Sequence, residues 1–226
     1  MLDATGRARV TDFIAKAFAT EFLHACEQLE WKLVLNEGKE LYHLSNADLA
    51  AMGAEKRNAM LGAVYENAKD RFQYLYESYH IADQYNSGAG RTGIAAQFFE
   101  AMNSEAGLEA LRALTGDQNI KYMDAIATRY RPGHFLTVHN DFVPGEDRLF
   151  AYVLNLSPQW RADWGGLLLF LSDDGNVSGG YTPRFGALNI FKVPQAHSVS
   201  VVSPFAGAPR YSISGWFRSS RPTPKT

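Results

Sequence analysis

The stretch FLTVHNDFVPG, residues 135–145, carries a histidine and an aspartate two positions apart, His139 and Asp141. On an extended chain, side chains at positions i and i+2 point to the same face, so these two can share one metal ion. The pair alone is weak evidence, because six histidines give a fair chance of one such spacing. A polar strand end is the better explanation unless other residues support a metal site.

A second histidine, His197, opens another predicted strand in the stretch FKVPQAHSVSVV. It lies far enough from Asp141 along the chain to come from a different strand. Two histidines and one carboxylate on adjacent strands form the facial triad, which leaves open positions on iron(II) for substrates and oxygen. His139, Asp141 and His197 are therefore candidates for an iron(II) site.

Three further residues are candidates for binding a carboxylate beside such a metal. Arg210 begins the stretch RYSISGWF, and an arginine inside a β-sandwich is costly unless it is paired. Its fork of N–H donors suits a two-pronged contact with the carboxylate of a buried guest. Ser212 faces the same side as Arg210, and Tyr130 ends an earlier strand, so both are placed to hydrogen-bond that carboxylate. A purely structural role stays open for both.

The first half of the chain, residues 1–117, is mostly helical in pattern. Thr11 or Asp12 is a candidate N-cap for its first helix, and Ser45 for a later one. Gly116 closes the last helix. The predicted elements are a helix over residues 11–29, a strand pair with a glycine turn over 31–44, one long helix or two over 45–83, and two short helices over 93–116.

The second half, residues 118–218, has a β pattern. Seven candidate strands follow one another with no helix between them, so the sheet is antiparallel. We predict an α+β, mainly β domain, a double-stranded β-helix (jelly roll) whose first-half helices cover one sheet. Residues 1–226 form one domain in this prediction, with a flexible tail over 219–226. The candidate strands are residues 122–130, 134–139, 148–156, 165–173, 186–193, 197–204 and 210–218.

The order H-x-D, a distant H, and then R before a strand with S and W resembles the 2-oxoglutarate- and iron(II)-dependent oxygenases. The stretch TRYRPGHFLTVHND is similar to their prolyl-hydroxylase branch, in which a tyrosine lies nine or ten residues before the first metal histidine. The stretch QWRADWGGLLLFLSDDG also matches that branch, with a Trp, a Gly-Gly and an acidic-glycine turn after the following strand. The nearest likeness is to the catalytic domain of the ribosomal-protein prolyl hydroxylases. A second tyrosine that the oxygen-sensing enzymes carry is replaced here by Leu136.

The resemblance implies roles for the candidate residues. His139, Asp141 and His197 would bind Fe(II), while Arg210, Tyr130 and Ser212 would bind 2-oxoglutarate. The resemblance further implies that 2-oxoglutarate would react with O2 to give succinate and CO2. In the same reaction a carbon atom of the substrate would be hydroxylated, with a prolyl residue of a protein or peptide as the leading candidate. A requirement for ascorbate is left open.

Other functions stay open beside the prolyl hydroxylase. The same chemistry could act on a free amino acid or small metabolite, and a metal-binding jelly roll could serve as a sensor without turnover. A cupin-type metalloenzyme is less favoured, because the chain has no matching H-x-H. The glycine-rich stretch at residues 84–93 is predicted to be a loop, either folding over substrate or plain surface. Trp216 is either core or pocket lining.

The composition of the chain limits which binding partners and which cellular compartment we expect. The formal net charge of -2 gives no reason to expect a nucleic acid or an anionic membrane as partner. No apolar run is long enough for a transmembrane helix, and the N-terminus lacks the pattern of a signal peptide. The single cysteine, Cys26, is predicted to be a buried core thiol. We expect a cytoplasmic protein.

Overall fold

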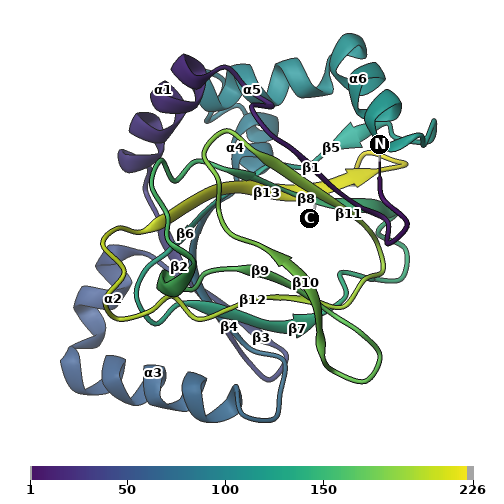
Figure 1. Cartoon of the computed structure of the whole chain (residues 1–226). Helices are drawn as coiled ribbons and strands as arrows, with labels where there is room; N and C mark the ends of the chain where they lie inside the picture. Colours follow the sequence, from purple (N-terminus) through teal and green to yellow (C-terminus); the bar gives the residue numbers. More distant parts are fainter. Residues whose placement is uncertain (1, 223–226) are drawn as a thin grey trace.

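A curled antiparallel sheet forms the centre of the computed structural model, which describes residues 2–222 (Figure 1). The strands are β1 (Arg7–Val10), β2 (Lys32–Glu37), β3 (Glu40–Leu44), β4 (Tyr74–Tyr79), β5 (Tyr122–Met123), β6 (Ile126–Tyr130), β7 (Phe135–His139), β8 (Arg148–Asn155), β9 (Leu168–Leu171), β10 (Val177–Tyr181), β11 (Leu188–Lys192), β12 (His197–Val199) and β13 (Arg210–Arg218). They follow the order β1-β11-β8-β13-β6-β4-β7-β12-β9-β10, with β2, β3 and β5 attached beside this path.

The strand β4 joins the two walls of this sheet. Its residues Glu77, Ser78 and Tyr79 pair with β6, whereas Tyr74 and Leu75 pair with β7. One wall therefore holds β1, β11, β8, β13 and β6, and the other holds β7, β12, β9 and β10. All strand pairs of the described chain are antiparallel, as short connections without crossover helices require. The predicted α+β jelly roll is confirmed.

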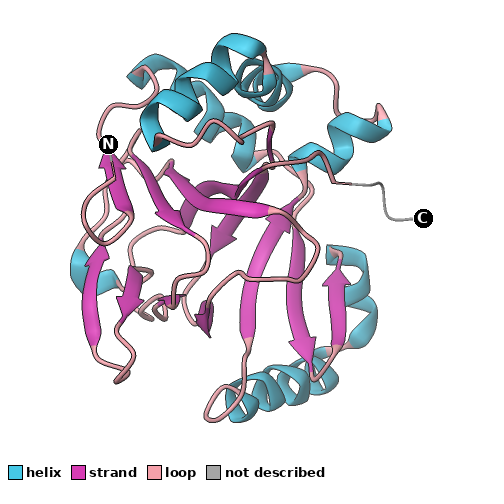
Figure 2. Cartoon of the chain, turned by 90° about the vertical axis from the view of Figure 1, so that its right-hand side faces the viewer, coloured by secondary structure: helices cyan, strands magenta, loops and turns pink. Residues whose placement is uncertain are grey.

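Helices pack on both walls, at the top and bottom of Figure 2. They are α1 (Lys16–Glu27), α2 (Asn46–Met52), α3 (Ala54–Asn67), α4 (Ile81–Ser87), α5 (Gly93–Asn103) and α6 (Glu105–Thr115), with a short 3-10 helix at Ala162–Trp164. The helices α1, α4, α5 and α6 share one apolar core with β8, β11 and β13. Val64 of α3 instead packs with Leu33, Leu75 and Phe135 of β2, β4 and β7. The expectation that all helices cover one sheet is therefore wrong for α3.

The largest error of the sequence prediction concerns β4. The pattern over residues 45–83 predicted helix throughout, but α3 ends at Asn67 and residues 74–79 form a strand. The stretch YLYESY places tyrosine at every second or third position, and aromatic residues favour strands. Within it, Leu75 is 1% exposed and lies against the α3 side, while Tyr76 lies on the opposite face of the strand.

Three smaller errors have local causes. The strands β1 and β10 were not predicted, and α1 begins at Lys16 after a turn, with no side-chain cap from Thr11 or Asp12. In β10, Gly180 has no room for a Cβ atom, which would meet the Leu169 side chain at 2.8 Å. Glycine weakens the strand pattern in sequence, yet here it permits the close approach of two strands.

Other local predictions are confirmed. Ser45 is the N-cap of α2, and its side chain and that of Asp48 form a reciprocal capping box. Gly116 ends α6 in the left-handed conformation, with φ 78°. The strands β2 and β3 form the expected pair, with Gly38 in the turn at φ 60°. No helix in residues 2–222 is long and apolar enough to cross a membrane.

The glycine-rich stretch at residues 84–93 lies among the helices. Its first four residues are the end of α4, not loop as predicted, and Tyr85 packs on Phe99 of α5 with ring centroids 5.0 Å apart. Its position therefore does not support the alternative of a cover over the strand-lined site. In the predicted tail, Ser219 and Ser220 hydrogen-bond to Asp147, and residues 223–226 lie outside the described part.

Cys26 is buried in the core between helices and sheet, as predicted, with an exposed fraction of 1%. Burial raises the pKa of its thiol to about 12, so the thiolate is scarce at pH 8. We expect no reaction of folded protein with Ellman's reagent at pH 8, and one equivalent of thiol after unfolding in guanidinium chloride. Rapid release of one equivalent from folded protein would contradict this placement.

Candidate functional site

The two histidines of the candidate triad lie on neighbouring strands. His139 ends β7, His197 begins β12, and the two are direct partners in the antiparallel pairing. The register shifts by one residue between this pair and the pair Leu136–Val199, which marks a β-bulge. Leu136 packs with Val199 in an interior cluster. Side chains alternate along a regular strand, so His139, three positions after Leu136, would otherwise face the opposite side. The bulge turns His139 to the same interior as Leu136.

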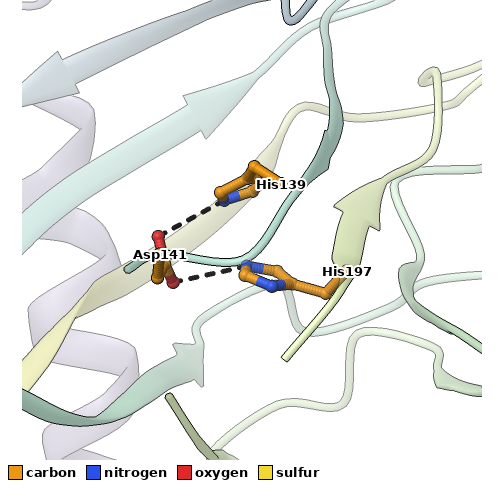
Figure 3. A group of neighbouring side chains, drawn as sticks. All are labelled: His139, Asp141 and His197. Atoms are coloured by element: carbon orange, nitrogen blue, oxygen red, sulfur yellow. Dashed lines mark ion pairs between the residues drawn. The ribbon is translucent and has the colours of Figure 1, made fainter. Parts of the chain in front are cut away.

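Asp141 completes the group directly after β7 (Figure 3). Its Oδ1 lies 3.4 Å from Nε2 of His139, and its Oδ2 lies 3.4 Å from Nε2 of His197. One ligand atom from each residue lies within 4.8 Å of the others. Asp141 has a φ of 62°, which is uncommon for a non-glycine residue and common at functional sites. The structure therefore brings together all three predicted ligands.

Backbone carbonyls orient both imidazoles toward the shared point. Nδ1 of His139 lies 3.0 Å from the carbonyl oxygen of Thr137, and Nδ1 of His197 lies 2.8 Å from that of Gln195. A carbonyl only accepts hydrogen bonds, so each Nδ1 carries the proton that it donates. Each Nε2 then has a free lone pair that faces Asp141. Metal-binding histidines are typically held in this way by the other ring nitrogen.

The protonation states suit a divalent cation. Burial, with the neighbouring His139, lowers the pKa of His197 to about 4, so its imidazole is neutral at pH 7. Burial alone would raise the pKa of Asp141, but the neighbouring His139 and His197 lower it below its usual value. A neutral imidazole and an ionised carboxylate are the forms that bind metal.

Arg148 and Trp216 support Asp141 from the β8–β13 wall. Arg148 donates a hydrogen bond of 3.0 Å to the backbone oxygen of Asp141, and its guanidinium carbon lies 3.6 Å from the ring centroid of Trp216. Trp216 is partly buried and packs at the edge of the interior cluster of Phe170, Phe191 and Val193. This packing favours the core role for Trp216, and a role in lining a substrate pocket stays a prediction.

Arg210 is buried without a counter-ion. It is 2% exposed, no ion pair joins it to a carboxylate within residues 2–222, and its Nε has no hydrogen-bond partner. Its guanidinium carbon lies 5.2 Å from the ring centroid of Tyr130, its partner across β13 and β6. Gly166 permits this packing, because a Cβ atom there would meet Cδ of Arg210 at 3.1 Å. Burial lowers the pKa of Arg210.

Ser212 and Tyr130 line the same inner face as Arg210. Alternation along β13 points Arg210 and Ser212 to one side, while Ile213 packs against the helices. The Ser212 hydroxyl lies 2.8 Å from Oγ1 of Thr128, so it already has one partner. Tyr130 is 3% exposed, and burial raises the pKa of its phenol, which stays protonated and able to donate. Their roles as ligands of a cosubstrate stay predictions.

A row of aromatic residues on β4 and just before it was not predicted from the sequence. Tyr76 stacks on Tyr130 with ring centroids 5.0 Å apart and an interplanar angle of 13°. Tyr74 lies 5.6 Å from Tyr76, and Phe72 lies 5.7 Å from Tyr74 and 5.5 Å from His139. The alternation of tyrosines in YLYESY was the signal that could have identified them, but the segment was predicted to be helical.

Residues 125–218 match the family model of the 2OG-Fe(II) oxygenase superfamily. Prolyl 3-hydroxylase sudestada1 of Drosophila melanogaster is 32% identical over 158 residues, which cover 63% of this chain and 28% of that protein. Prolyl 3-hydroxylase OGFOD1 of Xenopus laevis is 34% identical over 114 residues, which cover 47% of this chain and 22% of that protein. The chain thus spans roughly a quarter of the length of these relatives.

Two solved structures share the fold. A prolyl-4-hydroxylase of Pseudomonas putida superposes with a TM-score of 0.61 at 20% identity, over 95% of this chain and 93% of that one. A prolyl hydroxylase of Trichoplax adhaerens, solved with a hypoxia inducible factor peptide, also has a TM-score of 0.61, at 16% identity, over 96% of this chain and 85% of that one. The segment that matches the 2OG-Fe(II) oxygenase model contains the triad and Arg210, and the chain is similar in sequence to prolyl 3-hydroxylases and shares its fold with prolyl hydroxylases.

Proposed function

We propose that this chain is an Fe(II)- and 2-oxoglutarate-dependent dioxygenase that hydroxylates a prolyl residue of a protein or peptide. One atom of O2 enters a C–H bond of the substrate as a hydroxyl group. The other enters succinate, which forms from 2-oxoglutarate with release of CO2. The names of the two curated relatives and of both solved structures support the choice of a prolyl substrate.

The residues present fit iron(II). His139 and His197 each offer Nε2, and Asp141 offers a carboxylate oxygen, from one side of the site. Three protein ligands of this kind leave positions open for a cosubstrate and for O2. Bound Fe(II) would supply the oxygen-activating chemistry, and the protein would fix the ligands and exclude water.

Arg210 is the observation that carries the cosubstrate assignment. An unpaired charge in a protein interior is strongly unfavourable, so a buried guanidinium without a carboxylate indicates a ligand that supplies one. The far carboxylate of 2-oxoglutarate meets this need. Tyr130 beside Arg210 is positioned to donate a further hydrogen bond, and Ser212 shares their face of the sheet.

A turnover assay tests this proposal. The protein is incubated in air with Fe(II), 2-oxoglutarate and a set of proline-containing peptides, and succinate and peptide mass are measured. We expect succinate that depends on peptide, and a mass gain of one oxygen atom located on proline by fragmentation. Matched peptides with alanine in place of proline are the control. Equal succinate from both peptide sets without any mass gain would contradict a prolyl substrate.

A further inference from the structure

Four aromatic side chains form a continuous row from the surface to the buried arginine. We call Phe72, Tyr74, Tyr76 and Tyr130 the aromatic ladder. Successive ring centroids along it lie 5.7, 5.6 and 5.0 Å apart. Tyr130 ends next to the guanidinium of Arg210, and Phe72 lies 5.5 Å from the ring of His139. The aromatic ladder therefore runs beside the triad from the surface to the proposed cosubstrate position.

Exposure falls along the aromatic ladder. Phe72 is 48% exposed, Tyr74 and Tyr76 are partly buried, and Tyr130 is 3% exposed. Phe72 is a large apolar group that stays exposed beside His139, and such groups beside a reactive site indicate a binding surface.

The aromatic ladder is fixed to the strand that carries His139. The backbone N–H of Gln73 donates to Oγ1 of Thr137 at 2.8 Å, and the backbone N–H of Thr137 donates to the carbonyl of Gln73 at 2.9 Å. The carbonyl of the same Thr137 accepts from Nδ1 of His139. The buried Gln73 side chain also holds Asn36 on β2. Phe72 and Tyr74 are therefore held at a set distance from the metal ligand.

The surface chemistry distinguishes a prolyl residue in a chain from free proline. The pyrrolidine ring is apolar and packs well on aromatic faces, which is how proline-rich segments bind aromatic grooves. Free proline carries an ammonium and a carboxylate, and against the negative faces of aromatic rings the carboxylate would lose hydration without gaining a partner. A residue inside a peptide carries neither charge, and its neighbours can extend along the row of rings.

We propose that the aromatic ladder is the substrate-docking surface, on which Phe72 and Tyr74 bind a prolyl residue of an extended peptide beside the triad. This inference rests on the proposed function and names the residues that would bind its substrate. Tyr76 and Tyr130 form the inner end of the aromatic ladder, where the docking surface meets the proposed cosubstrate position.

Peptide binding by surface variants tests the inference. The probe is the proline-containing peptide that supports the most turnover by the wild-type protein. Its dissociation constant is measured under argon with Fe(II) and 2-oxoglutarate present, so that binding occurs without reaction. We expect Phe72→Ala and Tyr74→Ala each to weaken peptide binding about tenfold, as loss of a buried aromatic contact typically does. Phe72→Tyr keeps the ring and should stay within about twofold of wild type.

Tyr42→Ala is the matched control, because Tyr42 is 37% exposed and pairs with Leu35, whose side chain packs on the α3 side. Free L-proline is the competitor and should not displace the peptide. The docking surface would be overturned if the three alanine variants bound the peptide equally well while the wild type hydroxylates it. That result would leave the proposed function standing. Displacement by equimolar free proline would also overturn the docking surface. Absence of turnover with every peptide would overturn this inference and the proposed substrate together.

Discussion

Replacing His197 by alanine is expected to abolish iron binding and turnover. His197 is 4% exposed, its Nδ1 is tied to the Gln195 carbonyl, and its Nε2 faces Asp141 at 3.4 Å. Loss of a group that merely orients a metal ligand typically costs 10–100-fold in affinity or activity, so loss of a ligand should exceed about 100-fold. Iron affinity by competition with a chelator and succinate formation are the two measurements.

His24→Ala is the matched control for this variant. His24 is an exposed histidine on α1, far in the fold from β7 and β12, so its loss should change neither measurement. Far-ultraviolet circular dichroism of both variants establishes that they fold. A folded His197→Ala protein that binds iron and forms succinate like the wild type would remove His197 from the site.

Replacing Arg210 by alanine is expected to weaken 2-oxoglutarate binding while iron still binds. Removing one partner of a buried, hydrogen-bonded charge pair costs roughly 2–5 kcal/mol, which corresponds to about a 30-fold or larger rise in the dissociation constant. Because Arg210 has no protein counter-ion to leave unpaired, the free energy of unfolding without ligand should fall little beyond the effect of the cavity.

Arg210→Lys separates charge from geometry. Lysine keeps the positive charge but lacks the planar fork, so its affinity for 2-oxoglutarate should lie between wild type and Arg210→Ala. Arg57→Ala, an exposed arginine on α3, is the control for nonspecific attraction of the dianion. An unchanged dissociation constant for 2-oxoglutarate in Arg210→Ala would contradict the cosubstrate assignment.

The candidate ligands could be proposed from the sequence because their signals are local. The i and i+2 spacing of His139 and Asp141 and the strand patterns around His197 and Arg210 depend only on neighbouring residues. The β-bulge in β7 could not be predicted in this way. It depends on pairing with β12, which lies more than fifty residues further along the chain. Without it, His139 would not share the interior with Leu136.

The strand β4 shows why other parts of the fold were not predicted from the sequence. The Ala-rich pattern of α3 ends at Asn67, and the next residues carry no Pro or Gly to mark the boundary. Only partners from three other strands make Tyr74–Tyr79 a strand, namely β2, β6 and β7. Tertiary pairing of this kind overrides a local helical prediction. Missing β4 also meant missing the aromatic ladder.

One site is expected to hold Fe(II) and 2-oxoglutarate together, a claim that an anaerobic titration tests. Fe(II) and 2-oxoglutarate are added to the metal-free protein under argon, and the visible spectrum is recorded. A weak charge-transfer band that saturates at one iron per chain, and that requires both additions, is the predicted result. Protein that binds iron but develops no band with excess 2-oxoglutarate would contradict the claim and leave a jelly roll that binds metal without this cosubstrate.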